Sequence, residues 1–94
     1  MFLHIGSNEI VLMKDIIAIM DIERTTTSQT TRKYLKKCEE KGIIQTIGDD
    51  IPKSFIITRE EGKDKVYLSP ISSSTLNKRA LKKIKPNRRI LPHD

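Results

Sequence analysis

The residues best suited to chemistry in this chain are basic, and they gather in its last quarter. Lys78, Arg79, Lys82 and Lys83 recur at helical spacing, which places them on one side of a helix. Ammonium and guanidinium groups bind phosphate and carboxylate oxygens through charge-assisted hydrogen bonds. The pattern therefore indicates a surface that binds an anion carrying many charges.

The charge is divided unevenly along the sequence. Residues 1–71 carry eleven basic and eleven acidic side chains, whereas residues 72–94 carry seven basic side chains and one acidic side chain, which accounts for the whole net charge of +6. Such asymmetry favours a polyanionic partner. The alternative is a solvated tail that only keeps the protein in solution.

Residue types that commonly serve catalysis or bind metals are few and scattered. Cys38 is the single cysteine, and His4 and His93 lie far from it in the sequence. Asp49 and Asp50 are adjacent in a turn, so they do not form an evident pair of facing carboxylates. We find no glycine-rich phosphate loop, no zinc-type cysteine spacing and no nucleophile with a placed histidine. The sequence predicts no enzyme, no cofactor, no metal site and no small-molecule substrate.

Two helices are expected, and the first covers residues 29–41. Thr27 or Ser28 is the predicted N-cap, and Gly42 is typical of the residue that ends a helix. Cys38 falls within the apolar stripe of this helix, which predicts a packing role for its thiol.

The second helix is expected over residues 74–85, after a Ser/Thr cluster that can cap it. Its apolar side chains are Leu76, Ala80, Leu81 and Ile84. We expect this stripe to pack on a hairpin formed by residues 55–58 and 66–68, leaving the basic side free.

Short apolar and β-branched runs separated by turn residues predict the strands. They cover residues 2–5, 9–13, 16–20, 43–44, 55–58 and 66–68. The run at 16–20 is almost continuously apolar, which favours a central strand between the first hairpin and strand 55–58. The expected fold is α+β, a small mixed or mostly antiparallel sheet of five or six short strands with two main helices.

Length and composition predict one domain, residues 1–85, followed by a flexible basic C-terminal tail, residues 86–94. No apolar run reaches the ~18 residues that a membrane span requires, and the first residues lack the pattern of a signal peptide. Together with the single cysteine, this indicates a cytoplasmic protein.

Several short segments, in this order and spacing, resemble a known family. They are MFLHIG at 1–6, IIAIMD at 16–21, PKS at 52–54, YLSP at 67–70 and SSSTL at 72–76. The family is that of the RemA-type extracellular matrix regulators of Gram-positive bacteria, and the resemblance is to its RemB (YaaB) branch. It extends from Met1 to about Lys83. It implies a small cytoplasmic DNA-binding protein that activates biofilm-matrix genes and assembles into rings with DNA on the outer rim.

The resemblance also implies binding residues. Lys14 falls where the RemA branch has an arginine implicated in DNA contact, and Lys53 falls on another basic position of the family. Asp50 and Ile51 stand where the RemA branch has adjacent arginines. An acid at a phosphate contact weakens binding, so the basic helix and tail can take over that contact.

Combining the charge pattern with the resemblance, we expect a homo-oligomeric, ring-forming transcription regulator that binds the backbone of double-stranded DNA. The expected DNA-binding residues are Lys14, Lys53, Lys78, Arg79, Lys82, Lys83, Arg88 and Arg89. The alternative is a non-enzymatic oligomeric scaffold whose basic face binds an acidic protein or an anionic surface.

Overall fold

The computed structural model describes residues 1–25 and 27–88, with side chains described for residues 1–24 and 27–82. The strands are β1 (Phe2–Gly6), β2 (Glu9–Leu12), β3 (Ile16–Asp21), β4 (Ile44–Thr46), β5 (Ser54–Glu60) and β6 (Lys63–Ser69). The helices are the short η1 (Met13–Asp15) and α1 (Ile22–Thr25), and the longer α2 (Gln29–Glu40) and α3 (Ser73–Arg88). The predicted α+β class with six short strands and two main helices is confirmed.

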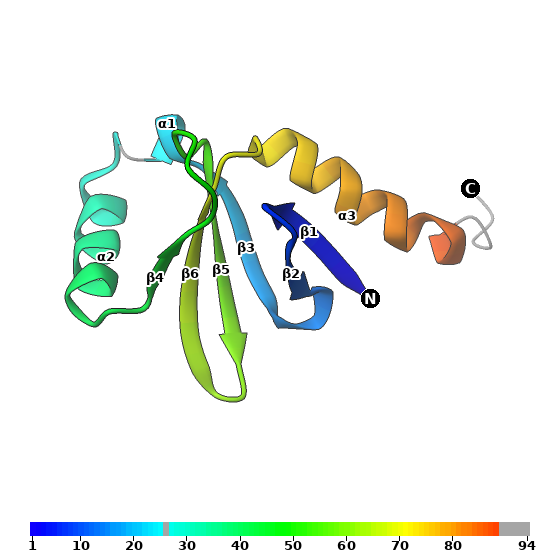
Figure 1. Ribbon diagram of the computed structural model, residues 1–94, viewed down its shortest axis with the longest axis horizontal. Coiled ribbons are helices and arrows are strands. Elements are labelled where there is room, and N and C mark those ends of the chain that lie inside the picture. The colour runs from blue at the N-terminus through cyan, green and yellow to red at the C-terminus, as the bar shows by residue number, and fades with distance from the viewer. Residues whose placement is uncertain (26, 89–94) are drawn as a thin grey trace.

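The strands form two separate sheets. β1 and β2 make an antiparallel hairpin, and the other four strands follow the order β3-β5-β6-β4. β4 is parallel to β6, while the remaining pairs are antiparallel, so the larger sheet is mixed. Figure 1 shows α2 and α3 on opposite sides of the four-stranded sheet, with the β1–β2 hairpin on the side of α3.

The prediction that strand 16–20 is central is wrong, because β3 lies at an edge of the larger sheet and pairs with β5. The hairpin packs on the face of this sheet and does not extend it, so it covers Ile16 and Ile19 by side-chain contact. Ile17 is the extra residue of a bulge opposite Ile57 and Thr58, and its side chain is 57% exposed. A continuous apolar run therefore does not mean burial on every side here.

Each face of the larger sheet has its own apolar core. On the hairpin face, buried Leu3 and Ile5 pack with Ile56 and Tyr67 and with Leu76 of α3. On the other face, Phe55, Val66 and Cys38 form a second cluster with partly buried side chains of α2. Alternation along β5 sends Phe55 and Ile56 to opposite faces, as the period of two in a strand requires.

The first long helix begins and ends near the predicted residues. The Thr31 N–H donates to the Ser28 hydroxyl oxygen at 3.4 Å, so Ser28 is the N-cap. Gly42 has a φ of +72°, the left-handed conformation that glycine adopts at little cost. Cys38 is buried against the sheet, which confirms its expected place in the core.

The second long helix packs differently from the prediction. The Thr75 N–H donates to the Ser72 hydroxyl oxygen, so the Ser/Thr cluster does cap α3. The helix then lies mainly against β1 and β3, and not along the β5–β6 hairpin, because the β1–β2 hairpin occupies part of that face. Leu76 is fully buried, whereas Leu81 is 52% exposed, so the apolar stripe is only partly covered.

The described part of α3 reaches Arg88, beyond the predicted end of the helix at residue 85. The rest of the predicted tail, residues 89–94, lies outside the described residues. Within the part of the chain that is described, no helix combines the length and apolar character of a membrane span.

A polar network joins the far end of the β5–β6 hairpin to the core. The hydroxyls of Tyr67 and Thr58 donate to the same Glu60 carboxylate oxygen at 2.7 and 2.8 Å, and the Lys65 ammonium lies 3.5 Å from the other oxygen. Burial alone would raise the pKa of Glu60, but these hydrogen bonds and the lysine charge outweigh it, so the pKa lies below its usual value.

We expect Tyr67→Phe to destabilise the protein by about 1–3 kcal/mol at neutral pH, because it removes a donor to a charged acceptor. A carboxyl whose folded pKa is lowered stabilises the fold above its unfolded pKa, and this contribution disappears as pH falls through the folded pKa. Urea unfolding of the wild type and the variant near pH 7 and near pH 3 should therefore show a smaller difference in the free energy of unfolding at the lower pH. A loss independent of pH, or one unchanged in a Glu60→Gln background, would contradict this account.

Candidate nucleic-acid interface

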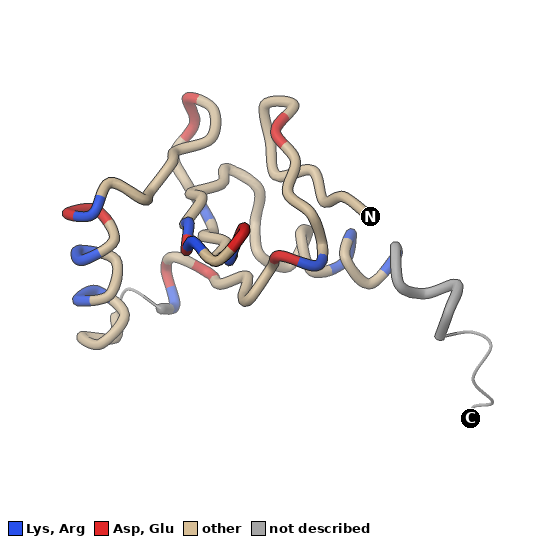
Figure 2. Tube along the Cα trace, turned by 90° about the horizontal axis from the view of Figure 1, so that it is seen from below, with Lys and Arg blue, Asp and Glu red and all other residues tan. Residues whose placement is uncertain are grey.

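The predicted basic surface lies on α3. Lys78, Arg79 and Lys82 are exposed, and they lie on the second and third turns of the helix. Lys83 and Arg88 belong to the same helix but their side chains are not described, and Arg89 lies outside the described residues. Figure 2 shows basic residues on both α2 and α3, which lie at opposite ends of the molecule.

The two long helices differ in their charge balance. α2 carries Glu39 and Glu40 among its basic residues. By contrast, Ser73–Arg88 contains no acidic residue. Positive charge on α3 is therefore not offset within the helix, and the potential along it favours a polyanion.

Burial of Leu76 anchors α3 to the body. A further contact holds its exposed side, because Arg79 Nη1 donates to the backbone carbonyl of His4 at 3.3 Å. Sequence reasoning missed this contact, since the two residues are 75 positions apart and a backbone carbonyl carries no side-chain signal. One side of the helix is thus fixed, and its basic groups are presented from a defined position.

Lys14 and Lys53, the residues suggested by the family resemblance, lie at opposite ends of the β3–β5 pair. Lys14 is in η1, just before Ile16, whose partner in β5 is Thr58. Lys53 precedes Ser54, whose partner is Asp21 at the far end of β3. At roughly 3.4 Å per residue, the length of a strand separates the two lysines, so they do not form one cluster within the chain.

Helix α3 begins at one of these two ends. It starts just after Ser69, whose carbonyl accepts the Lys53 N–H, so its first turn is near Lys53. The helix then passes along β1, and Lys82 lines the same cavity as Leu3. The Met13 N–H donates to the Met1 carbonyl, which places η1 and Lys14 near the start of β1. The helix therefore begins near Lys53, and Lys82 on its third turn lies beside β1.

The loop before β5 has the wrong charge for phosphate contact. Asp49 and Asp50 are exposed, and Ile51 is 83% exposed. The backbone of Lys53 is held on both sides, by the bond to Ser69 and by a bond from the Ile22 N–H to its own carbonyl. Lys53 is thus well positioned, but two acids share its loop.

Cys38 offers no exposed thiol, since its side chain is buried between α2 and the larger sheet. Among residues 1–25 and 27–88, no group of three His, Cys, Asp or Glu side chains could hold a metal ion. The functional groups of the candidate site are therefore its lysine and arginine side chains, and the position of α3 decides where most of them lie.

Comparison with known proteins places this arrangement in a family. A model of RemA-like proteins, described as extracellular matrix regulatory protein A-like, matches residues 2–80. The chain is also similar to extracellular matrix regulatory protein B of Bacillus subtilis (strain 168), with 36% identity over 80 residues, which is 85% of this chain and 90% of the relative. The match covers all six strands and the first half of α3. The resemblance noted in the sequence is confirmed, and the chain belongs to the RemA-like family of extracellular matrix regulatory proteins.

Proposed function

We propose that this protein is a DNA-binding transcription regulator of extracellular matrix genes that acts as a ring-forming homo-oligomer in the bacterial cytoplasm. The observation that carries the proposal is the basic side of α3, a helix without acidic residues. Leu76 anchors this helix to the core of a domain that belongs to a family of regulatory proteins. The proposed contacts are Lys14, Lys53, Lys78, Arg79, Lys82, Lys83, Arg88 and Arg89.

The chemistry of these residues favours binding to the DNA backbone. Lysine and arginine neutralise phosphates and release condensed counterions, a favourable term that does not depend on base sequence. Lys78 and Lys82 are four residues apart, so they present charge along one side of α3. Backbone contact of this kind positions a protein on the duplex and leaves sequence preference to other contacts.

The geometry favours α3 over the loop before β5 as the main contact. Asp50 and Ile51 occupy the loop, and the carboxylates near Lys53 would repel phosphate. Lys53, near the first turn of α3, and Lys14, just before β3, then extend the contact within one subunit or across neighbouring subunits of a ring.

Exposed apolar groups support assembly. β3 has one strand neighbour, and Ile17 protrudes from its bulge into solvent. Phe2 and Ile10 on the hairpin are 49% and 44% exposed. An open strand edge and exposed large apolar side chains are features that association between copies would cover.

The test of DNA binding is an electrophoretic mobility titration of duplex DNA with the full chain at several salt concentrations. The proposal predicts binding at low salt whose logarithm of affinity falls linearly with the logarithm of salt concentration. The absence of binding at low salt would reject the DNA proposal and favour the oligomeric scaffold for an acidic partner.

We expect light scattering to give a closed oligomer well above the monomer mass of 10.8 kDa. Ile17→Lys should shift the protein toward monomer, because a lysine on a strand edge opposes pairing with another chain. Ile51→Lys is the matched control, since that side chain is also exposed but lies in a loop outside the sheet. A wild-type monomer at all concentrations would contradict the assembly, and equal effects of the two variants would contradict the role of β3.

A further inference from the structure

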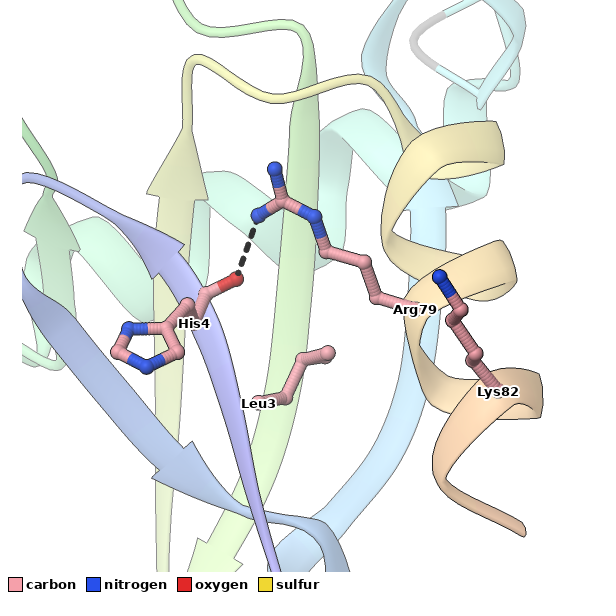
Figure 3. A pocket seen from close by; sticks show the side chains of 4 residues that line it. All are labelled: Leu3, His4, Arg79 and Lys82. Carbon is pink, nitrogen blue, oxygen red and sulfur yellow. Dashed lines mark hydrogen bonds between the residues drawn. The ribbon is translucent and has the colours of Figure 1, made fainter. Parts of the chain in front are cut away.

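A cavity of about 490 Å³ lies between β1 and α3. Its lining includes Leu3, His4, Arg79 and Lys82, and Figure 3 shows Arg79 reaching from α3 toward β1 with Leu3 below it. This volume is within the range of small-ligand sites in proteins.

The described lining carries two cations, and Leu3 belongs to the buried core behind them. Leu3 is fully buried and points toward α3, while the imidazole of His4 turns away from Arg79 (Figure 3). Arg79 and Lys82 are three residues apart, so they lie on the same side of the helix. Among the described residues that line the cavity, none is acidic.

Arg79 is held in place before any ligand arrives. Its bond to the His4 carbonyl at 3.3 Å uses one of the five N–H groups of a guanidinium and fixes the side chain across the cavity. A fixed guanidinium loses less conformational freedom on binding than a mobile one, so more of the interaction appears as affinity. The remaining N–H groups suit the oxygens of a phosphate or carboxylate.

We propose that this cavity binds a small organic anion, a compound in which a phosphate or carboxylate group is attached to an apolar or aromatic part. The anionic group would lie against the guanidinium of Arg79 and the ammonium of Lys82. The apolar part would lie along the aliphatic stems of the same two side chains, because Leu3 itself is fully buried. This site goes beyond the proposed function, because small-molecule binding does not require that the protein bind DNA. Neither the charge pattern nor the motifs of the sequence predict it, since Leu3 and Arg79 are brought together by the fold.

A consequence follows if α3 also contacts DNA. Arg79 and Lys82 belong to both surfaces, so the organic anion and the DNA backbone would compete for the same two cations. By linkage, a compound that occupies the cavity would weaken DNA binding, and DNA would weaken binding of the compound. The cavity would then be a regulatory site for the proposed DNA-binding surface.

Phenyl phosphate is a suitable probe because it joins one phosphate to one aromatic ring. Titration into ¹⁵N-labelled full-length protein should give saturable shifts of the amides of Leu3, His4, Arg79 and Lys82, with a dissociation constant of about 1 mM or lower. Inorganic phosphate and phenol should each bind at least about tenfold more weakly, because each lacks half of the interaction. Equal affinity for inorganic phosphate would overturn the organic part of the proposal, and shifts confined to other regions would overturn the site.

Variants separate the cavity from general attraction to positive charge. The double variant R79Q/K82Q should bind phenyl phosphate about tenfold or more weakly than the wild type, whereas the affinity of K78Q should stay within about twofold of the wild-type value. Lys78 is exposed on the same helix but does not line the cavity. Equal losses in the two proteins would mean that the probe senses only net charge. A folded double variant with unchanged affinity would reject the site outright.

A competition experiment keeps this proposal separate from DNA binding. Saturating phenyl phosphate should reduce duplex DNA affinity in the wild type and not in R79Q/K82Q. Saturable phenyl phosphate binding without any DNA binding would support the cavity and reject the regulator. DNA binding without any binding of phenyl phosphate would support the regulator and reject the cavity as a ligand site.

Discussion

We expect weaker binding to duplex DNA when glutamine replaces Lys78, Arg79, Lys82 and Lys83. The slope of the logarithm of affinity against the logarithm of salt concentration should become shallower by up to about 3.6 per engaged subunit. Each neutralised phosphate contributes about 0.9 to this slope through counterion release. Side chains that face solvent in the complex contribute nothing, so the measured change counts the contacts on α3. The measurement is a mobility or anisotropy titration at four or more salt concentrations.

The quadruple variant should stay folded, because the substitutions leave Leu76 and its core contacts unchanged. Its matched control replaces four exposed lysines near or within α2, namely Lys33, Lys36, Lys37 and Lys41. This control changes net charge by the same amount on the other side of the sheet. Similar effects of the two sets would mean that overall charge attracts DNA, and α3 would lose its assigned role.

A second comparison places Lys14 and Lys53 relative to α3. If α3 is the main contact with DNA, Lys14→Gln and Lys53→Gln should each reduce the slope by no more than about one unit. If these two changes abolish binding while the α3 changes have no effect, the contact lies on the ends of the β3–β5 pair. The outer side of α3 would then be a solvated surface.

Leu76→Ala is expected to destabilise the protein by about 2–5 kcal/mol, the range for a fully buried leucine truncated in a core. The Leu76 side chain is 0% exposed and packs with Leu3, Ile5, Ile56 and Tyr67, so its loss leaves a cavity between α3 and both sheets. Small domains have a total stability of about 5–15 kcal/mol, so this change removes a large part of it. Urea unfolding followed by circular dichroism gives the difference directly.

Leu81→Ala provides the control on the same helix, because Leu81 is 52% exposed and little packing is lost. It should cost less than about 1 kcal/mol. Leu76→Ala should also weaken DNA binding under conditions where most molecules are folded, since α3 would no longer be held against β1 and β3. Similar costs at the two positions would show that α3 is not anchored as the contacts indicate.

Much of the local structure was predictable because its causes lie within a few residues. Ser28 caps α2 through a bond to Thr31, and Gly42 ends the helix in a left-handed conformation. Strand positions followed from apolar runs, and Ser72 caps α3 as its neighbouring hydroxyl residues suggested. These signals depend on side chains three or four positions apart, so no knowledge of the fold is required to recognise them.

The charge division was also determined by sequence alone, and it located the basic helix correctly. The family followed from short segments whose order and spacing are preserved along most of the chain. Neither observation required a sheet order or a contact between distant segments. The binding partner of the basic surface remains a prediction that the DNA titrations test.

Tertiary structure alone decided how the elements meet. The apolar run of β3 can be covered by strand pairing or by face packing, and both bury similar side chains, so its edge position could not be read from the sequence. The same holds for Arg79 and His4, which the fold joins across 75 positions, and for Lys14 and Lys53, which it separates to opposite ends of a strand pair. Local periodicity specifies which side of an element is apolar, whereas the surface that covers it depends on competing arrangements of the whole chain. The cavity between β1 and α3 also depends on the arrangement of the whole chain, because only the packed chain brings Leu3, Arg79 and Lys82 together.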